Sequence, residues 1–300
     1  MDRLRTIVVG VDFSECSAAA LRTALRLAES PGAVHAIHVI DALAVSAAPR
    51  LESDLRRAIE GSLTEQAQRA WEGLVRQVPG AEAARFTALL APRTAALRDA
   101  AVAEGAELLV VGAFGDRRPN VGLGTMATAC VRHASVPVLL VRTGGRESLR
   151  RVGAFVDFSE TSRAALGLAA RIAAVERAAL VAVHVFDAPW RRLTYLAAAP
   201  IVDPAFERAQ LEELRSRLRR FVDQSLGSAA EGVAVDVHDR PGGHRIGIAE
   251  YAESEGLDLV AMGTRGGRNL RDALLGSTAE RALRDVAVSL LAVPAAPTDA

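Results

Sequence analysis

The sequence predicts an α/β fold in which two copies of one domain follow each other along the chain. Three observations support this prediction: a long internal repeat, an alternation of strand-like and helix-like segments, and strands that are apolar along nearly their whole length. Such strands are typical of parallel sheets that are covered on both faces. The length of 300 residues is sufficient for about two domains.

The repeat joins segments that lie about 150 residues apart, which is too long a period for a solenoid. The matching pairs are Val11–Glu15 with Val156–Glu160, His38–Asp41 with His184–Asp187, and Glu104–Gly112 with Glu255–Gly263. We therefore expect one domain over residues 1–145 and a second over 149–300. The segment 143–148 between them is polar and bears glycines, as linkers often do.

The second half begins with an apolar strand over Val152–Val156. Ser159 follows it and is placed to cap a helix that runs to about Val175, because its side chain can accept from free backbone N–H groups. Leu180–Val185 is the next apolar strand. Phe206–Leu226 carries apolar residues at helical spacing among many Arg and Glu, which predicts an amphipathic helix.

The remaining elements follow the same alternation. Val233–Val237 alternates as a strand does, Arg245–Ser254 has a helical pattern, and Leu257–Met262 is a buried strand. A last helix is expected over Leu270–Arg284 and a closing strand over Val286–Val293. Parallel sheets of this kind bind ligands outside the carboxyl ends of their strands. The residues expected at those ends are Asp12, Asp157, Gly112 and Gly263.

The charge composition excludes several classes of function. The chain has 36 basic and 36 acidic residues, and every basic residue is arginine. A Walker A loop, a Schiff-base or pyridoxal enzyme and a protein kinase each need a lysine, so none is present in standard form. The zero net charge argues against nucleic acid and against a polybasic membrane anchor, because both interactions use excess positive charge.

Cysteine usage and hydropathy predict a cytoplasmic protein. Only Cys16 and Cys130 are present, which is too few for a disulfide framework and favours a reducing compartment. Apolar runs such as Ile7–Val11 and Leu108–Val111 have the length of strands and are shorter than a membrane-spanning helix. The chain starts Met-Asp-Arg-Leu-Arg-Thr, and no signal peptide fits there.

A glycine-bearing loop follows the strand Leu257–Met262 and runs from Gly263 to Thr278. Its glycines allow sharp turns and a close approach of backbone to ligand. Gly276-Ser277-Thr278 then opens onto a helix, whose free N–H groups and dipole suit an anion without any lysine. Arg265 and Arg268 are placed to add forked bonds to phosphate. A solvated loop that caps a helix is an equal alternative at this point.

Both halves resemble domains of the universal stress protein (UspA-type) family. The family's nucleotide signature is G-x2-G-x9-G-[ST], which the second half matches with Gly263, Gly266, nine further residues and Gly276-Ser277. The resemblance covers nearly the whole chain. It implies two tandem Rossmann-like, HUP-type (adenine nucleotide alpha hydrolase-like) domains, each a five-stranded parallel sheet flanked by helices.

The resemblance to ATP-binding members implies an adenine nucleotide as partner, namely ATP, with Mg²⁺ as a candidate companion ion. The implied binding residues of the second half are Asp157 near the ribose or adenine, Val185 and the loop Arg240–Gly242 as walls of the adenine pocket, and Gly263, Arg265, Gly266, Gly276, Ser277 and Thr278 around the ribose and phosphates. The family also implies an intramolecular pseudo-dimer, in which the two last strands, Val138–Val141 and Leu290–Val293, pair edge to edge. Association of two chains into a homodimer is left open.

The first half departs from the signature and predicts a weaker site. Its loop has eight residues rather than nine between Gly115 and Gly124, Asp116 places a negative charge near the expected phosphate, and Pro119 removes a backbone donor. The corresponding residues of this weaker site are Asp12, Val39, Gly112, Gly115, Gly124 and Thr125.

Several other residues have simpler structural explanations. His38 and His184 are expected to be packed, hydrogen-bonded core histidines. Ser14 and Ser159 are expected to be helix caps, since no His-Asp partners lie near them in the sequence. The charged run Glu207–Arg220 has the spacing of a solvated helix face.

Enzyme activity stays open, and no catalytic or metal-binding residue is assigned. Cys130 and His133 share a helix face, but no second ligand pair accompanies them as a zinc site requires. Two other classes remain as alternatives: a nucleotide-independent interaction scaffold, and an enzyme of the adenine-nucleotide α-hydrolase class. The loop's place after the fourth strand disfavours the enzyme, since those enzymes carry their phosphate loop after the first strand.

Overall fold

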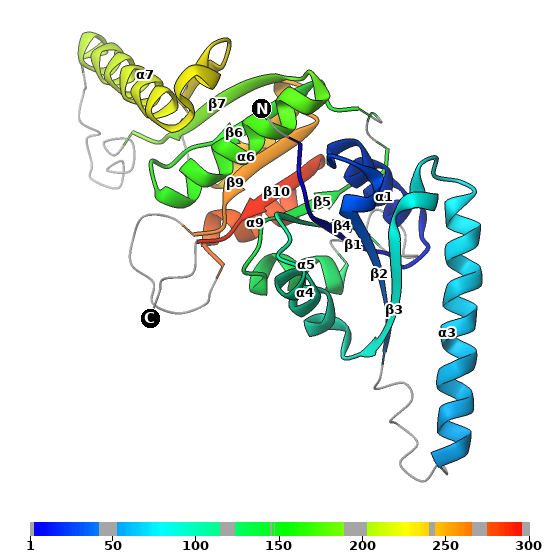
Figure 1. Ribbon diagram of the computed structural model, residues 1–300. Coiled ribbons are helices and arrows are strands. Elements are labelled where there is room, and N and C mark those ends of the chain that lie inside the picture. The colour runs from blue at the N-terminus through cyan, green and yellow to red at the C-terminus, as the bar shows by residue number, and fades with distance from the viewer. Residues whose placement is uncertain are drawn as a thin grey trace, which may run out of the picture. The chain divides into compact units, whose positions relative to one another are not determined.

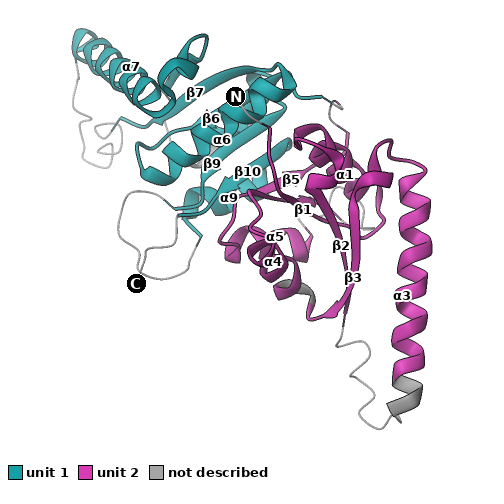
Figure 2. Cartoon of the chain, in the orientation of Figure 1, with its two compact units in different colours: residues 1, 148–300 teal, residues 2–147 magenta. Residues whose placement is uncertain are grey.

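The computed structural model describes residues 3–41, 53–114, 124–144, 146, 148–188, 203–239, 244–265 and 275–295. The chain divides into two compact units, which we call the N-terminal unit (residues 2–147) and the C-terminal unit (residues 148–300), shown in separate colours in Figure 2. Each unit is an α/β domain whose described residues form five strands, as the sequence predicts.

The N-terminal unit carries its strands in the order β3-β2-β1-β4-β5, and each pair of neighbours is parallel. This order places β1 at the centre, between β2 and β4 (Figure 1). The elements are β1 Ile7–Gly10, α1 Glu15–Leu27, η1 Pro31–Ala33, β2 Val34–Asp41, α3 Ser53–Val75, η2 Ala81–Ala83, β3 Arg85–Ala91, α4 Arg93–Ala103, β4 Leu108–Gly112, α5 Thr125–His133 and β5 Val138–Val141.

The C-terminal unit repeats this topology in the order β10-β9-β6-β7-β8, again with parallel neighbours. Its elements are β6 Arg151–Phe155, α6 Glu160–Glu176, β7 Ala179–Phe186, α7 Pro204–Leu226, η4 Gly227–Ala230, β8 Ala234–Asp239, α8 His244–Ser254, β9 Leu259–Gly263, α9 Ser277–Asp285 and β10 Ser289–Val293. The central strand β6 therefore corresponds to β1, and β9 corresponds to β4.

Helices cover both faces of each sheet because successive strand side chains point to opposite faces. On β7, His184 contacts Phe158 in the turn before α6, whereas the next residue, Val185, faces Gly247 of α8. Helices α6 and α7 pack together on one face, and α8 and α9 pack together on the other.

The strand interiors form the core, and they are apolar on both faces as the sequence predicts. Leu108 and Leu109 of β4 and Leu259 and Val260 of β9 are fully buried although they alternate in direction. Only a sheet covered on both sides buries consecutive residues in this way.

Most predicted boundaries lie within two residues of those in the structure, but two predicted starts are wrong by three residues or more. The sequence predicts a helix over Leu270–Arg284, but α9 begins at Ser277, and Leu275 and Gly276 are not helical. The backbone at Gly276 is extended, with φ −61° and ψ 144°, because its N–H turns to the carbonyl of Thr264. The closing strand begins at Ser289 rather than Val286, since the N–H of Val286 still bonds to Ala282 as the end of α9.

None of the helices among the described residues is long and apolar enough to cross a membrane. Across the same residues, no group of three or more His, Cys, Asp or Glu side chains is placed to hold a metal ion.

Candidate functional site

The turn after β6 places Asp157 at the carboxyl end of the central strand of the C-terminal unit. Its side chain is exposed, and one carboxylate oxygen, Oδ1, accepts from the backbone N–H of Ser159 at 3.0 Å and from the Ser159 hydroxyl. The Ser159 oxygen in turn caps α6 by accepting from the N–H of Ser162 at 3.2 Å. One serine therefore both starts the helix and orients the carboxylate.

Phe158, between these two residues, has a left-handed backbone with φ +65°. A phenylalanine in that region is uncommon and needs support from its surroundings. Two side chains of α7 contact its ring. The guanidinium carbon of Arg217 lies 4.0 Å from the ring centre, and the centre of the Phe221 ring lies 5.6 Å from it. The His184 ring is tilted against the Phe158 ring, with their centres 4.7 Å apart. The Nδ1–H of His184 donates to Val156 O at 2.7 Å. These contacts hold the turn that carries Asp157.

The end of β9 lies beside the first turn of α6. A side chain on Gly263 would place its Cβ 2.7 Å from the hydroxyl oxygen of Thr161 and 2.8 Å from Thr161 Cβ. Glycine at this position therefore allows the close approach of strand and helix. The Thr161 hydroxyl donates to the backbone carbonyl of Arg265, whose side chain is exposed.

Gly276 forms the start of α9 next to the same strand end. Its N–H donates to Thr264 O at 2.9 Å, and Thr264 N–H donates to Val293 O at 2.9 Å. No side chain caps the helix at Gly276. The first intrahelical bond runs from Glu280 N–H to Gly276 O, so the N–H groups of the preceding helical residues have no acceptor within the helix. That helix end attracts anions.

The N-terminal unit has the same backbone arrangement. Asp12 Oδ1 accepts from the N–H and the hydroxyl of Ser14 at 3.1 and 2.5 Å, and Phe13 has φ +64°. Gly124 starts α5 without a side-chain cap, and its N–H donates to Ala113 O at 2.9 Å. The repeat therefore extends from sequence to the local geometry of the strand ends.

The two units differ in the side chains that surround this backbone. The position of Thr161 is occupied in the N-terminal unit by Cys16, whose thiol donates to Val141 O at 3.1 Å. The guanidinium of Arg142 lies 5.0 Å from the centre of the Phe114 ring, and burial lowers its pKa. Phe114 takes the place of Arg265, so the exposed cation of the C-terminal loop has no direct counterpart at that position.

The structure brings together most of the residues that the sequence singles out. Asp157 follows β6, whereas Gly263, Arg265, Gly276, Ser277 and Thr278 lie where β9 ends and α9 begins. Val185 and Val39 are buried near the ends of β7 and β2. In the N-terminal unit, Asp12, Gly112, Gly124 and Thr125 occupy the corresponding places. The predicted residues that lie outside the described part of the chain are Gly115, Asp116, Pro119, Arg240–Gly242, Gly266 and Arg268.

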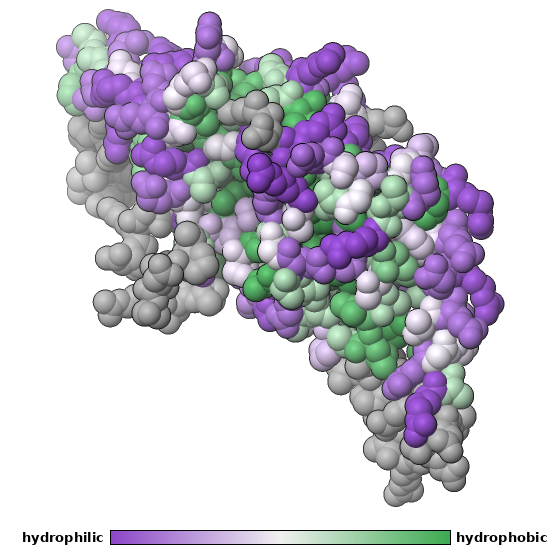
Figure 3. All heavy atoms as spheres, viewed as in Figure 1, coloured by the Kyte–Doolittle hydropathy of each residue, from purple (hydrophilic) through white to green (hydrophobic). Residues whose placement is uncertain are grey.

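Other predictions about individual side chains are confirmed. Ser14 and Ser159 are helix caps, and His38 Nδ1–H donates to Val11 O at 2.8 Å as a partly buried core histidine. Helix α7 is a mostly hydrophilic, exposed element (Figure 3), with ion pairs such as Arg215–Glu212 at 2.5 Å.

Sequence reasoning missed Thr161 and the Phe158–Arg217 contact. The contrast between Thr161 and Cys16 at matching positions of the repeat was a usable signal for the first. Nothing in the sequence pairs Phe158 with Arg217, because their contact depends on how α7 packs.

The sequence profile of the universal stress protein family matches the chain twice, over residues 3–142 and 148–294. The chain belongs to the universal stress protein family. Both repeats are thus universal stress domains, and the tandem arrangement predicted from the repeat is confirmed.

Curated relatives have the length of one such domain. Universal stress protein G of Salmonella typhimurium is 33% identical over 144 residues, which is 46% of this chain and 99% of the relative. The protein of the same name from Escherichia coli O157:H7 is 32% identical over 147 residues, again 46% of this chain and 99% of the relative.

A solved universal stress protein from Archaeoglobus fulgidus has the same two-domain fold. It superposes with a TM-score of 0.64 at 19% identity and covers 97% of this chain and 98% of its own. At this identity the likeness shows the fold alone.

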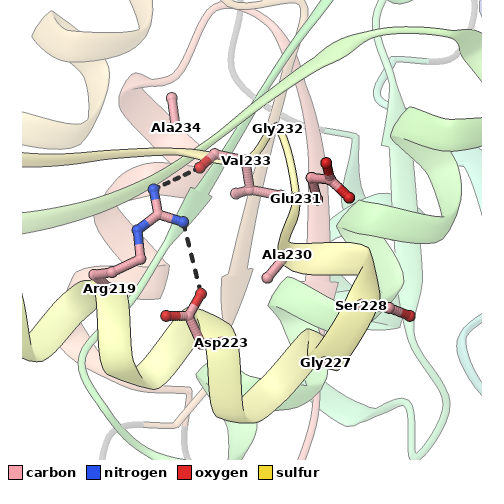
Figure 4. A pocket seen from close by; sticks show the side chains of 9 residues that line it. All are labelled: Arg219, Asp223, Gly227, Ser228, Ala230, Glu231, Gly232, Val233 and Ala234. Atoms are coloured by element: carbon pink, nitrogen blue, oxygen red, sulfur yellow. Dashed lines mark hydrogen bonds and ion pairs between the residues drawn. The ribbon is translucent and has the colours of Figure 1, made fainter.

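A hollow of the C-terminal universal stress domain lies at the start of β8, away from the strand ends described above (Figure 4). The Arg219 side chain extends from α7, donates to Val233 O at 2.7 Å and lies 3.8 Å from Asp223 Oδ1. The cation is thereby already paired within the protein. The residues that line the hollow are Arg219, Asp223, Gly227, Ser228, Ala230, Glu231, Gly232, Val233 and Ala234.

Proposed function

We propose that the protein is an ATP-binding regulatory module of the universal stress type, with the nucleotide bound mainly in the C-terminal unit. The observation that carries this proposal is the uncapped start of α9 at Gly276, which lies beside the glycine-bearing end of β9. Backbone N–H groups at a helix start bind phosphate without a lysine, and this chain has no lysine.

The side chains around this helix start suit the two ends of a nucleotide. Arg265 is exposed next to Gly263 and supplies the positive charge that a phosphate needs. Asp157 is exposed at the end of the adjacent central strand, and its carboxylate can accept from ribose hydroxyls. Val185 would form part of the adenine wall, and Gly266 and Thr278 would complete the loop around the phosphates.

The N-terminal unit is the weaker site under this proposal. It keeps the carboxylate of Asp12 and the uncapped glycine of Gly124, but it has Phe114 where the C-terminal unit has Arg265. At this position a phosphate would meet Phe114 in place of the guanidinium of Arg265. We further propose that the two domains pair within one chain as a pseudo-dimer, and that the protein acts in the cytoplasm.

Calorimetric titration of ATP into the full chain tests the proposal. We expect about one strong site per chain and a rise in the melting temperature, since a ligand that binds only the folded state stabilises it. If ATP gave neither a heat of binding nor a shift in melting temperature, the result would contradict the proposal and favour a nucleotide-independent scaffold. Release of pyrophosphate from ATP would instead favour an α-hydrolase enzyme.

A further inference from the structure

A chain of polar contacts links the carboxylate of Asp157 to the backbone of the glycine loop in the C-terminal unit. The Ser159 hydroxyl donates to Asp157, the hydroxyl oxygens of Ser159 and Thr161 lie 2.9 Å apart, and the Thr161 hydroxyl donates to the carbonyl of Arg265. Thr161 and Arg265 are 104 positions apart in the sequence, and the hydrogen bond between them is made by a buried side chain, because Thr161 is 8% exposed.

The proton count shows which contacts are hydrogen bonds at one time. Ser159 and Thr161 have one hydroxyl proton each. With the Ser159 proton on Asp157 and the Thr161 proton on Arg265 O, no proton is left for the 2.9 Å contact between the two hydroxyl oxygens. The hydrogen bond from Thr161 to Arg265 O is therefore the bond of this path that reaches the glycine loop.

Two successive carbonyls fix the backbone where the loop leaves β9. Thr264 O accepts from Gly276 N–H at 2.9 Å, and Arg265 O accepts from Thr161. The first of these bonds has an exact counterpart in the N-terminal unit, where Ala113 O accepts from Gly124 N–H at 2.9 Å. The second does not, because the Cys16 thiol at the matching position bonds to Val141 O instead.

We propose that Thr161 is a positioning residue that holds the backbone of Arg265 in place for phosphate, and that it makes the C-terminal unit the stronger nucleotide site. This inference rests on the proposed function. It assigns to Thr161 an effect on the phosphate end of the ligand, with the nucleoside end held separately by Asp157. Gly263 supports this role, because a Cβ there would displace the Thr161 side chain.

Thr161→Val removes the hydroxyl and keeps the shape of the side chain. Calorimetry with ATP and with adenosine, on the full chain, separates the two ends of the ligand. We expect ATP affinity to fall by roughly five- to tenfold, the usual effect of one lost hydrogen bond, and adenosine affinity to stay within about twofold. Thr161→Ser keeps the donor and should restore the ratio of the two affinities.

Cys16→Val is the matched control in the N-terminal unit, and it should leave the strong ATP site unchanged. Thr161→Cys, which copies the side chain that the N-terminal unit accommodates, is a second variant should the valine fail to fold. An equal loss for ATP and adenosine, or an unchanged ATP affinity in a folded variant, would overturn the role of Thr161. Wild-type protein that binds no ATP would instead overturn the proposed function itself.

Discussion

Gly276 lies directly against the carbonyl of Thr264: its N–H donates to that oxygen at 2.9 Å, and a Cβ added to it would lie 3.2 Å from the same atom. The contact is tight but leaves a side chain sterically possible, and the φ of −61° is open to any residue. A substitution here therefore tests the helix start without dismantling the domain.

Gly276→Asp should abolish ATP binding while the protein stays folded. Aspartate is a favourable residue at the start of a helix, and this stabilisation offsets the strain of the added side chain. Its carboxylate would accept from the free N–H groups of α9 and so take the place proposed for the phosphate. Two like charges about 4 Å apart repel by about 4 kcal/mol near a protein surface, so we expect a loss of roughly a hundredfold or more in affinity by calorimetry.

The matched control is Gly124→Asp, at the start of α5 in the N-terminal unit, where φ is −60° and ψ is 148°. This variant should retain most of the ATP binding. Gly276→Asn adds the same bulk without the charge and should bind ATP more strongly than Gly276→Asp. If Gly276→Asp bound ATP as the wild type does, the phosphates would not lie at α9.

Gly263→Ala should destabilise the C-terminal unit by about 1–3 kcal/mol, the usual range for overpacking a filled site. Its Cβ would lie 2.7–2.8 Å from side-chain atoms of Thr161 and 3.1 Å from the backbone carbon of that residue. The backbone carbon cannot move without shifting α6. Denaturant unfolding of the full chain, followed by circular dichroism, measures the change.

Gly167→Ala is the control for that experiment, because Gly167 lies in the same helix and a Cβ there meets nothing within 4 Å. We expect it to stabilise the protein by up to about 1 kcal/mol, since alanine favours the helix. Comparable stabilisation by Gly263→Ala would show that the strand and helix have room to separate.

The fold was predictable from the sequence because its signals are local or periodic. The apolar strands, the caps at Ser14 and Ser159, and the repeat itself each lie within a few residues or at one fixed offset. These patterns predict where each strand ends. Because the strands are parallel, they also predict that Asp157 and Gly263 lie at the same edge of the sheet.

The start of α9 and the bridge through Thr161 were not predictable in the same way. Leu270–Arg284 carries a helical pattern of apolar residues, but the bond from Gly276 to Thr264 makes the backbone extended just before Ser277. The contact of Thr161 with Arg265 likewise joins two distant segments. Tertiary bonds of this kind override local propensity, and a single sequence does not reveal the partners of such bonds, even where a contrast between the repeats, as at Thr161 and Cys16, marks the position.

Cys130 should resist alkylation in the native protein. It is fully buried in α5, and burial raises the pKa of its thiol to about 11. Since the thiolate is the reactive form, iodoacetamide at pH 8 should modify Cys130 only after denaturation. Mass spectrometry of native and denatured samples measures this, and rapid modification of the native protein would contradict the packing of α5.

His35 should make the N-terminal unit less stable as the pH falls below about 6.5. Its Nε2 lies 2.8 Å from the Thr87 hydroxyl and its Nδ1 lies 3.1 Å from Glu104 Oε1, while Arg85 bonds to the same carboxylate at 2.6 Å. Burial, and then the charge of Arg85, lower the pKa of His35 below its ordinary value of 6.5 despite the opposing effect of Glu104.

The sign of the pH dependence follows from proton binding. Below pH 6.5 the unfolded chain takes up a proton at His35 before the folded chain does, so the free energy of unfolding falls as the pH falls toward the lowered pKa. The pKa of Glu104 is held below its ordinary value of 4.5 by its hydrogen bond from Arg85, so its own protonation acts only at still lower pH.

His35→Gln should remove the dependence of the free energy of unfolding on pH between about pH 6.5 and 5. Around pH 8, where His35 is neutral in both states, the two proteins should instead differ by a constant offset. A variant that kept the full wild-type slope would assign this pH dependence to other groups.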